Sequence, residues 1–154
     1  MLISLAYVST SYASSLLPLN TWAQAKQFNT LSVADTLILT LRCSIAYDIN
    51  KEIIEEYTDL KAEGLKNKII AYRSVYASSV AILMRGKNNS EKNKYMDSQT
   101  AEVKFINDAY FDAMKKNMPI PHSLNNELLA GDVGFCNSMD EKIIQTYNLI
   151  QKNK

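Results

Sequence analysis

This chain has few residues that turn a backbone sharply, and that shortage constrains its fold more than any motif does. It contains 4 Gly and 3 Pro among 154 residues. Between these few breaks, apolar residues recur at helical spacing over long stretches, as they do in amphipathic helices. A chain of this length buries a core without metal ions or multiple disulfides. We therefore expect an all-α protein, a compact bundle of about five to six helices in a single domain over residues 14–154.

The apolar spacing divides the chain into a series of helices. Ser32 with Asp35 three residues later resembles a capping box, and it opens a helix that runs to Ile49. Residues 37–45 also alternate as a strand would, but the apolar pattern outlasts a typical strand. Residues 75–84 are apolar on nearly every side, which predicts the central helix of the bundle. The other expected helices cover residues 20–28, 50–60, 65–84 and 97–116, with a break at Gly64, and the last one starts at Ser138. Residues 118–135, which include Gly131 and Gly134, predict an irregular segment interrupted by a short helix over residues 124–129.

The first thirteen residues, MLISLAYVSTSYA, are apolar and uncharged. Small residues at Ser11 and Ala13 match the pattern that a signal peptidase accepts after an apolar stretch. No Lys or Arg precedes this stretch, so two interpretations stay open, a signal-peptide remnant or an apolar arm. We favour the signal peptide and expect a periplasmic protein. Export would place the chain where disulfides persist.

The chain has two cysteines, Cys43 and Cys136. In an exported protein an even pair favours one disulfide, here closing a loop of about ninety residues. The alternative is two buried free thiols that pack as small apolar groups. Because Cys136 stands just before the last expected helix, a bridge would tie that helix to the core.

Several function classes lack their sequence signature. Lys and Arg total 17 against 16 Asp and Glu, which argues against a nucleic-acid binder. No long uncharged stretch after residue 13 predicts a membrane span. Neither metal-binding motifs nor glycine-rich phosphate loops occur, so we expect no metal and no cofactor.

Two enzyme hypotheses can be weighed, and only the first survives. It is a cysteine hydrolase with Cys136, or else Cys43, as thiolate and His122, the single histidine, as base. His122 stands in an irregular segment with nothing evident to orient it, so this remains the lesser alternative. The other is a glycosidase using a carboxylate pair, Glu55 with Glu56 or Asp140 with Glu141. Adjacent carboxylates on a helix diverge, so we interpret both pairs as solvated surface.

Residues 85–96, RGKNNSEKNKYM, are polar and predict an exposed loop. The loop is either ordinary solvated surface or a recognition element, since loops held by rigid helices are common binding devices. As the recognition element, it would contact a partner through Lys87, Asn88, Asn89, Lys92, Lys94 and Tyr95.

Two segments carry a resemblance to a known family. They are LRCSIAYD, which holds Cys43, and GFCNSMDEKIIQTY, which holds Cys136. In their order, and in the residues that follow each cysteine, they resemble the periplasmic immunity proteins that neutralise peptidoglycan amidase effectors of type VI secretion systems. One departure is Asn137, because the family usually has a Leu-Asp-Leu-Tyr-like stretch after the late cysteine.

The resemblance implies a non-enzymatic inhibitor, often a homodimer, whose protruding loop occludes the catalytic cleft of a Cys/His amidase. The predicted partner is thus a cognate peptidoglycan amidase effector, and the inhibitor protects the producing cell and its siblings. The alternative outside this class is an exported helical structural or interaction protein without an enzyme target.

Overall fold

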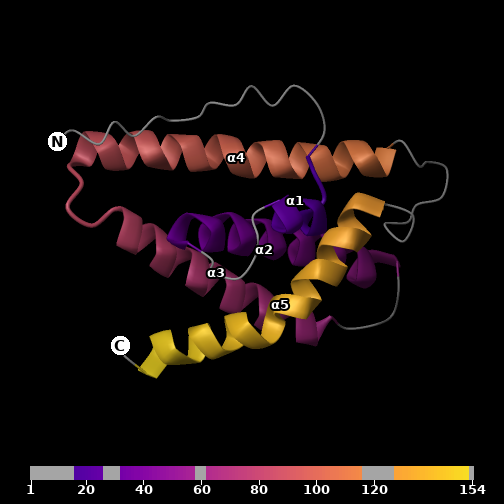
Figure 1. Cartoon of the computed structure of the whole chain (residues 1–154). Coiled ribbons are helices and arrows are strands. Elements are labelled where there is room, and N and C mark those ends of the chain that lie inside the picture. The colour runs from indigo at the N-terminus through magenta and orange to yellow at the C-terminus, as the bar shows by residue number, and fades with distance from the viewer. Residues whose placement is uncertain (1–15, 26–31, 58–61, 116–126, 153–154) are drawn as a thin grey trace.

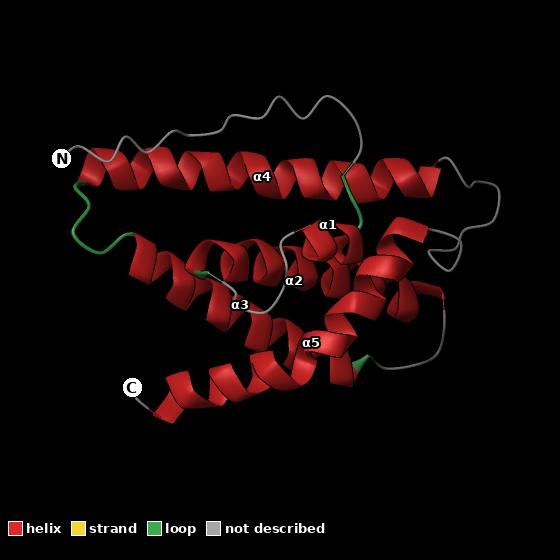
Figure 2. Cartoon of the chain, viewed as in Figure 1, coloured by secondary structure: helices red, strands yellow, loops and turns green. Residues whose placement is uncertain are grey.

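The computed structural model describes residues 16–25, 32–57, 62–115 and 127–152, and every regular element in these ranges is a helix (Figures 1 and 2). The predicted all-α fold is therefore confirmed. Residues 1–13, expected to be a signal peptide, lie outside the described part of the chain. The helices are α1 (Leu19–Ala25), α2 (Val33–Tyr57), α3 (Glu63–Leu83), α4 (Asn89–Lys115) and α5 (Glu127–Lys152).

The centre of the bundle is α2, not the end of α3. Every residue from Leu39 to Tyr47 is buried, so this part of α2 has no solvent-facing side. Figure 1 shows α3 and α5 on one side of α2 and α4 along the other. The prediction that residues 75–84 form the central helix is wrong, because Ile82 is more than half exposed. An all-apolar turn of helix therefore does not by itself identify the buried centre.

The buried side chains form two adjoining clusters, and α2 and α5 contribute to both. The first joins α1, α2, α3 and α5 through Leu19, Leu39, Cys43, Tyr47, Ile69, Tyr72, Val75, Cys136, Met139 and Ile143. The second joins α2, α4 and α5 through Leu41, Ile45, Ala46, Ile49, Ile106, Tyr110 and Leu129. The two faces of α2 thus hold opposite sides of the molecule together.

Two expected helices are one. The boundary predicted at Asn50 is absent, and α2 continues to Tyr57 because Ile49 and Ile53 extend its inward stripe. The capping box is confirmed: the Asp35 amide donates to Ser32 Oγ at 3.1 Å, and the Ser32 amide donates to an Asp35 carboxylate oxygen at 3.3 Å. Gly64, expected at a break, instead lies in the first turn of α3.

The last helix begins eleven residues before the predicted start at Ser138. Gly131 and Gly134, which suggested an irregular segment, lie on the exposed side of α5. Each glycine costs about 1 kcal/mol in a helix, but Leu129, Asp132 and Cys136 on the opposite side are all buried. Tertiary contacts therefore outweigh local propensity, and Cys136 lies in the middle of a helix rather than before one.

The predicted disulfide between Cys43 and Cys136 is confirmed. It joins the centre of α2 to the middle of α5 with the two Cα atoms 5.7 Å apart, across a sequence separation of 93. Chain-entropy arithmetic for a loop of this length gives a stabilisation of about 4–5 kcal/mol. Because domains are typically stable by about 5–15 kcal/mol, this single bond supplies a large share.

Candidate partner-binding tip

The turn between α3 and α4 is short and well braced. The amide of Met84 donates to Val80 O at 2.9 Å and closes α3, and the amide of Lys87 donates to Met84 O at 3.2 Å. Gly86 has φ of 78°, a left-handed conformation that glycine adopts without strain. The turn therefore reverses the chain within five residues, from Met84 to Asn88.

A capping box then opens α4. The Glu91 amide donates to Asn88 Oδ1 at 3.0 Å, and the Asn88 amide donates to a Glu91 carboxylate oxygen, also at 3.0 Å. The hydrogen bond from the Asn88 amide, with the nearby Lys87 ammonium, lowers the pKa of the Glu91 carboxyl from its usual value. The box makes residues 89–96 helical, so the prediction of a loop over residues 85–96 is wrong beyond Asn88. Its signal, Asn followed three residues later by Glu, is legible in the sequence.

The six residues proposed to contact a partner lie together around this turn but do not share one face. Asn89, Lys92 and Lys94 are exposed on the first two turns of α4. Lys87 lies in the turn, where its ammonium is 3.2 Å from Glu91. Tyr95 is half-buried, because it begins the inward stripe of α4 that continues through Gln99, Val103, Ile106 and Tyr110.

Sequence reasoning missed two apolar residues beside this turn. Ile82 near the end of α3 and Met96 on the second turn of α4 are each more than half exposed. Met96 follows Asn89 and Lys92 at helical spacing, so these three share the outward face of α4. The α3–α4 tip is the set of residues around the turn that are exposed, together with half-buried Lys87: Ile82, Arg85, Lys87, Asn88, Asn89, Lys92, Lys94 and Met96.

The α3–α4 tip carries an excess of positive charge. Residues 85–97 hold four cationic side chains and two acidic ones, in a chain whose net charge is only +1. Behind the tip, the Tyr76 hydroxyl donates to Gln99 Oε1 at 3.0 Å and links the two helices. A braced, cationic tip with two exposed apolar side chains is suited to contact another macromolecule.

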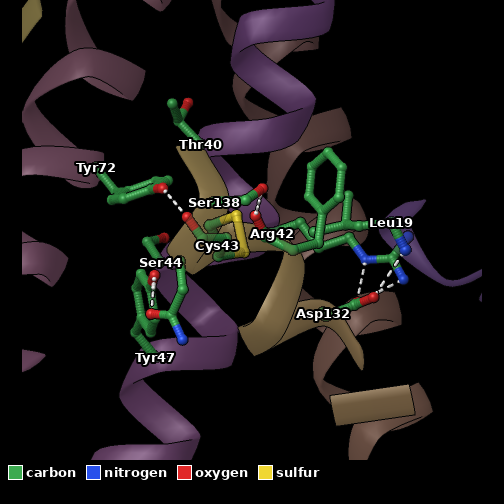
Figure 3. The surroundings of a disulfide bond; sticks show 12 residues. Leu19, Thr40, Arg42, Cys43, Ser44, Tyr47, Tyr72, Asp132 and Ser138 are labelled. Atoms are coloured by element: carbon green, nitrogen blue, oxygen red, sulfur yellow. Dashed lines mark hydrogen bonds and ion pairs between the residues drawn. A yellow bond between two sulfur atoms is a disulfide. The ribbon is translucent and has the colours of Figure 1, made fainter. Parts of the chain in front are cut away.

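The interior contains a buried charged hub that the sequence analysis did not identify. The Asp132 carboxylate on α5 is fully buried (Figure 3). Its Oδ2 accepts hydrogen bonds from Arg42 Nε at 2.8 Å and from the Tyr110 hydroxyl, while Arg42 Nη2 lies 2.6 Å from the same oxygen. Its Oδ1 accepts from the Leu19 amide at 2.7 Å. One carboxylate thus connects α1, α2 and α4 to α5.

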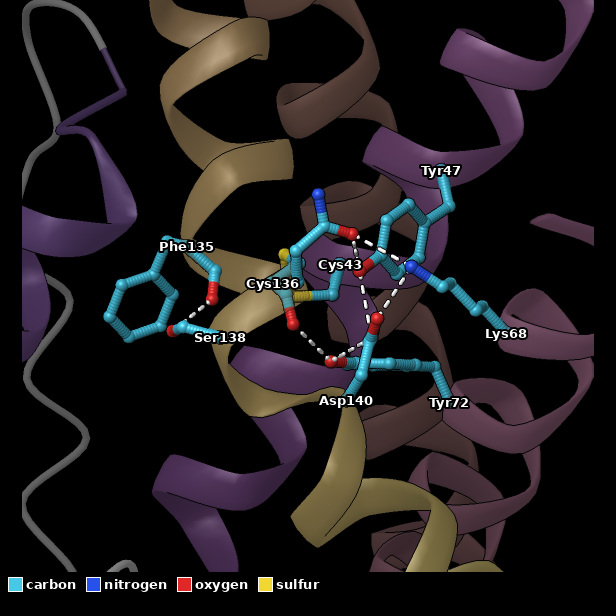
Figure 4. A network of polar contacts seen from close by, with 9 residues as sticks. Cys43, Tyr47, Lys68, Tyr72, Phe135, Cys136, Ser138 and Asp140 are labelled. Carbon is cyan, nitrogen blue, oxygen red and sulfur yellow. Dashed lines mark hydrogen bonds and ion pairs between the residues drawn. A yellow bond between two sulfur atoms is a disulfide. The ribbon is translucent and has the colours of Figure 1, made fainter. Parts of the chain in front are cut away.

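A second polar cluster lies two turns further along α5 and is partly exposed (Figure 4). Asp140 Oδ1 accepts a hydrogen bond from the Tyr47 hydroxyl at 2.8 Å, and the Tyr72 hydroxyl lies 3.1 Å from the same oxygen. Its Oδ2 lies 2.6 Å from the Lys68 ammonium, which also donates to Asn137 Oδ1 at 2.8 Å. The view of Asp140 as a solvated surface carboxylate is therefore wrong. Of the two pairs considered for glycosidase chemistry, Glu55, Glu56 and Glu141 are exposed.

The thiolate hypothesis loses its nucleophile in this structure. Both cysteines are in the bridge, and no free cysteine remains. His122 lies outside the described residues. Among the described residues, no cluster of His, Cys, Asp and Glu side chains is arranged to hold a metal ion. None of the described helices is long and apolar enough to cross a membrane.

Comparison with known proteins returned no match: no family model, no curated protein and no solved structure is similar to this chain.

Proposed function

We propose that this chain is a periplasmic immunity protein that binds a type VI secretion peptidoglycan amidase effector and occludes its active-site cleft. The observation that carries the proposal is that the two segments on which the family resemblance rests meet in space. Cys43 of the first segment is bonded to Cys136 of the second. The Tyr47 hydroxyl of the first lies 3.0 Å from Asn137 Oδ1 and 2.8 Å from Asp140 Oδ1 of the second.

These contacts support the structural part of the resemblance. Asn137, which departs from the family's sequence pattern, has a role of its own here, because its side-chain oxygen lies within hydrogen-bond distance of Tyr47 and Lys68. A buried disulfide also agrees with an oxidising compartment, where such bonds persist. From the family resemblance we further propose that the protein inhibits an amidase effector and that it forms a homodimer.

For the contact element we propose the α3–α4 tip. A cleft-filling inhibitor needs a projecting surface that does not deform on binding, since ordering a flexible segment costs affinity. The turn hydrogen bonds and the Asn88–Glu91 capping box hold this tip in one shape. Ile82 and Met96 would bury apolar area in the cleft, and the lysines would line an acidic rim.

The test uses any peptidoglycan hydrolase that a gene neighbouring this one encodes. Calorimetry should give nanomolar-class binding to the oxidised protein, with loss of peptidoglycan hydrolysis in the same mixture. Reversing two tip charges, Lys92→Glu with Lys94→Glu, should weaken binding by at least about a hundredfold, because desolvated charge pairs across an interface are worth several kcal/mol.

The matched control reverses two exposed lysines on α5, Lys142→Glu with Lys152→Glu, which changes net charge equally. It should alter affinity by less than about threefold, as expected of charges outside an interface. If both variants bind like the wild type, the tip is not the contact element. If the wild type binds no neighbouring cell-wall hydrolase, the immunity function is rejected and an interaction protein of another kind is left.

A further inference from the structure

The disulfide lies where no dissolved thiol reaches it. Cys43 and Cys136 are both fully buried. They belong to the cluster that includes Leu19 from α1, Tyr72 from α3 and Met139 from α5. Figure 3 shows residues of α1, α2 and α5 around the sulfur atoms. Thiol–disulfide exchange requires a thiolate to attack a sulfur directly, so the folded structure blocks the reaction sterically.

The Asp140 network closes the structure over the bridge on the α3 side (Figure 4). The Tyr72 hydroxyl donates to the carbonyl oxygen of Cys136 itself at 2.8 Å and also lies 3.1 Å from Asp140 Oδ1. Lys68 lies 2.6 Å from Asp140 Oδ2 and 5.2 Å from the centre of the Tyr47 ring. These contacts hold the middle of α5 against α2 and α3.

We propose that α5 gates the redox state of this protein: the bridge forms and breaks only while the stretch from Asn137 to Ile143, which follows Cys136 on α5, has lost its packing against α2 and α3 and leaves a sulfur atom accessible. Oxidation then proceeds by exchange with a disulfide of a thiol-oxidising enzyme. One cysteine thiolate attacks that disulfide and gives a mixed disulfide, and the second cysteine displaces the enzyme's thiol. Two electrons and two protons pass from the two thiols to the enzyme. Reduction is the reverse sequence with a dithiol.

Because of this gate, oxidation of the newly made chain is favoured over reduction of the folded protein. A newly made chain meets the oxidant before α5 docks, and after docking the same packing excludes reductants. Because a bridge of this span disfavours the unfolded chain by about a thousandfold or more, the oxidised protein seldom exposes its sulfur atoms and retains the bond in a moderately reducing medium. This inference holds whether or not the protein inhibits an amidase.

The experiment measures how fast dithiothreitol reduces the native oxidised protein, with free thiols trapped by alkylation and counted by mass spectrometry. We compare Met139→Ala with Ile144→Ala on the same helix. Met139 is 6% exposed and packs in the cluster that contains the bridge, whereas Ile144 is 39% exposed. Truncating the buried methionine should accelerate reduction by at least about thirtyfold, and truncating the exposed isoleucine by less than about threefold.

Wild-type protein in urea below its unfolding transition gives a second measurement that does not depend on a variant folding. The logarithm of the reduction rate should rise with urea, with a slope well below that of global unfolding, because only the surface beneath α5 is exposed. Three results would overturn the gate. The first is that dithiothreitol reduces the native protein as fast as it reduces a disulfide in an exposed peptide. The second is that the two variants are reduced at equal rates. The third is that the reduction rate depends on urea as steeply as global unfolding does.

Discussion

Helix α5 is fastened by two carboxylates that differ mainly in their burial. Asp132 and Asp140 lie eight residues apart on the same helix, and each binds one cation and at least one tyrosine hydroxyl. The Asp132 side chain has no solvent exposure and that of Arg42 only 5%. The Asp140 side chain is 15% exposed and that of Lys68 is 28% exposed. Similar chemistry therefore operates in two different dielectric environments.

The comparison separates what a charged cluster contributes from what its loss costs. A buried ion pair gives little net stability, but removing one partner leaves an unpaired charge that water cannot reach. A partly exposed pair is screened, and water replaces the missing partner. The Asp132 hub should therefore be fragile toward single substitutions, and the Asp140 cluster should tolerate them.

The largest effect is expected from Arg42→Met, which keeps an unbranched apolar stem and removes the guanidinium and its charge. Asp132 would retain the Leu19 amide and the Tyr110 hydroxyl but lose its only described cation. Urea unfolding monitored by circular dichroism should show a loss of about 3–5 kcal/mol in the free energy of unfolding.

The double variant Arg42→Met with Asp132→Leu provides the control. It removes both charges but leaves the Leu19 amide and the Tyr110 hydroxyl without their acceptor, so it should recover only part of the stability lost in the single variant. A single variant that loses less than about 1 kcal/mol would mean that the hub is hydrated, and the contrast between the two clusters would disappear.

The next prediction uses pH, because both clusters hold buried tyrosines. Burial raises the pKa of the Tyr110 hydroxyl above its usual value near 10, and the adjacent Asp132 charge adds to the shift. Burial also raises the pKa of Tyr47 and of Tyr72, with further contributions from their neighbours, including Asp140. The folded state therefore holds these protons more tightly than the unfolded state does.

A raised pKa in the folded state contributes stability that is fully present below pH of about 10 and is lost as the pH rises further. Above a pH of about 10, each phenol that stays neutral in the folded state should lower the free energy of unfolding by about 1.4 kcal/mol per pH unit. Ultraviolet absorbance should show these three tyrosinates appearing together with the loss of helical circular dichroism. If all nine tyrosines ionise while the helices remain intact, these phenols are accessible to water and the expected difference from surface tyrosines is wrong.

Those parts of the fold that depend on local pattern could be predicted from the sequence. The apolar stripes identified the helices, Ser32 with Asp35 marked the start of α2, and the cysteine pair was correctly joined. The boundaries depended on contacts between distant segments and were less predictable. Two glycines suggested a break where α5 is continuous, because buried Asp132 and Cys136 beside them hold the helix in place.

The polar clusters could not be predicted, because a charged residue within an apolar stripe does not show whether it is solvated or paired with a buried partner. Arg42 stands between Leu41 and Cys43, and nothing local shows that its partner is Asp132, ninety residues away. The tip was found by composition but with the wrong structure, since the Asn88–Glu91 capping box was read as part of a loop. Of its apolar members, Ile82 belonged to the stretch expected at the centre of the bundle, and Met96 ended the expected loop without being counted among the contact residues.

The smallest effect is expected from Lys68→Met, the counterpart of Arg42→Met in the exposed cluster. Asp140 would lose the ammonium 2.6 Å from its Oδ2 but keep the hydroxyls of Tyr47 and Tyr72 on Oδ1. Because the site is partly open, water can solvate the freed oxygen, and the loss should be about 1 kcal/mol or less in the same urea assay. Added salt should reduce the difference further, since it screens exposed pairs. A loss as large as that of Arg42→Met would mean that burial is not what distinguishes the clusters, and that the hold of Lys68 on α5 through Asp140 and Asn137 matters more than its exposure indicates.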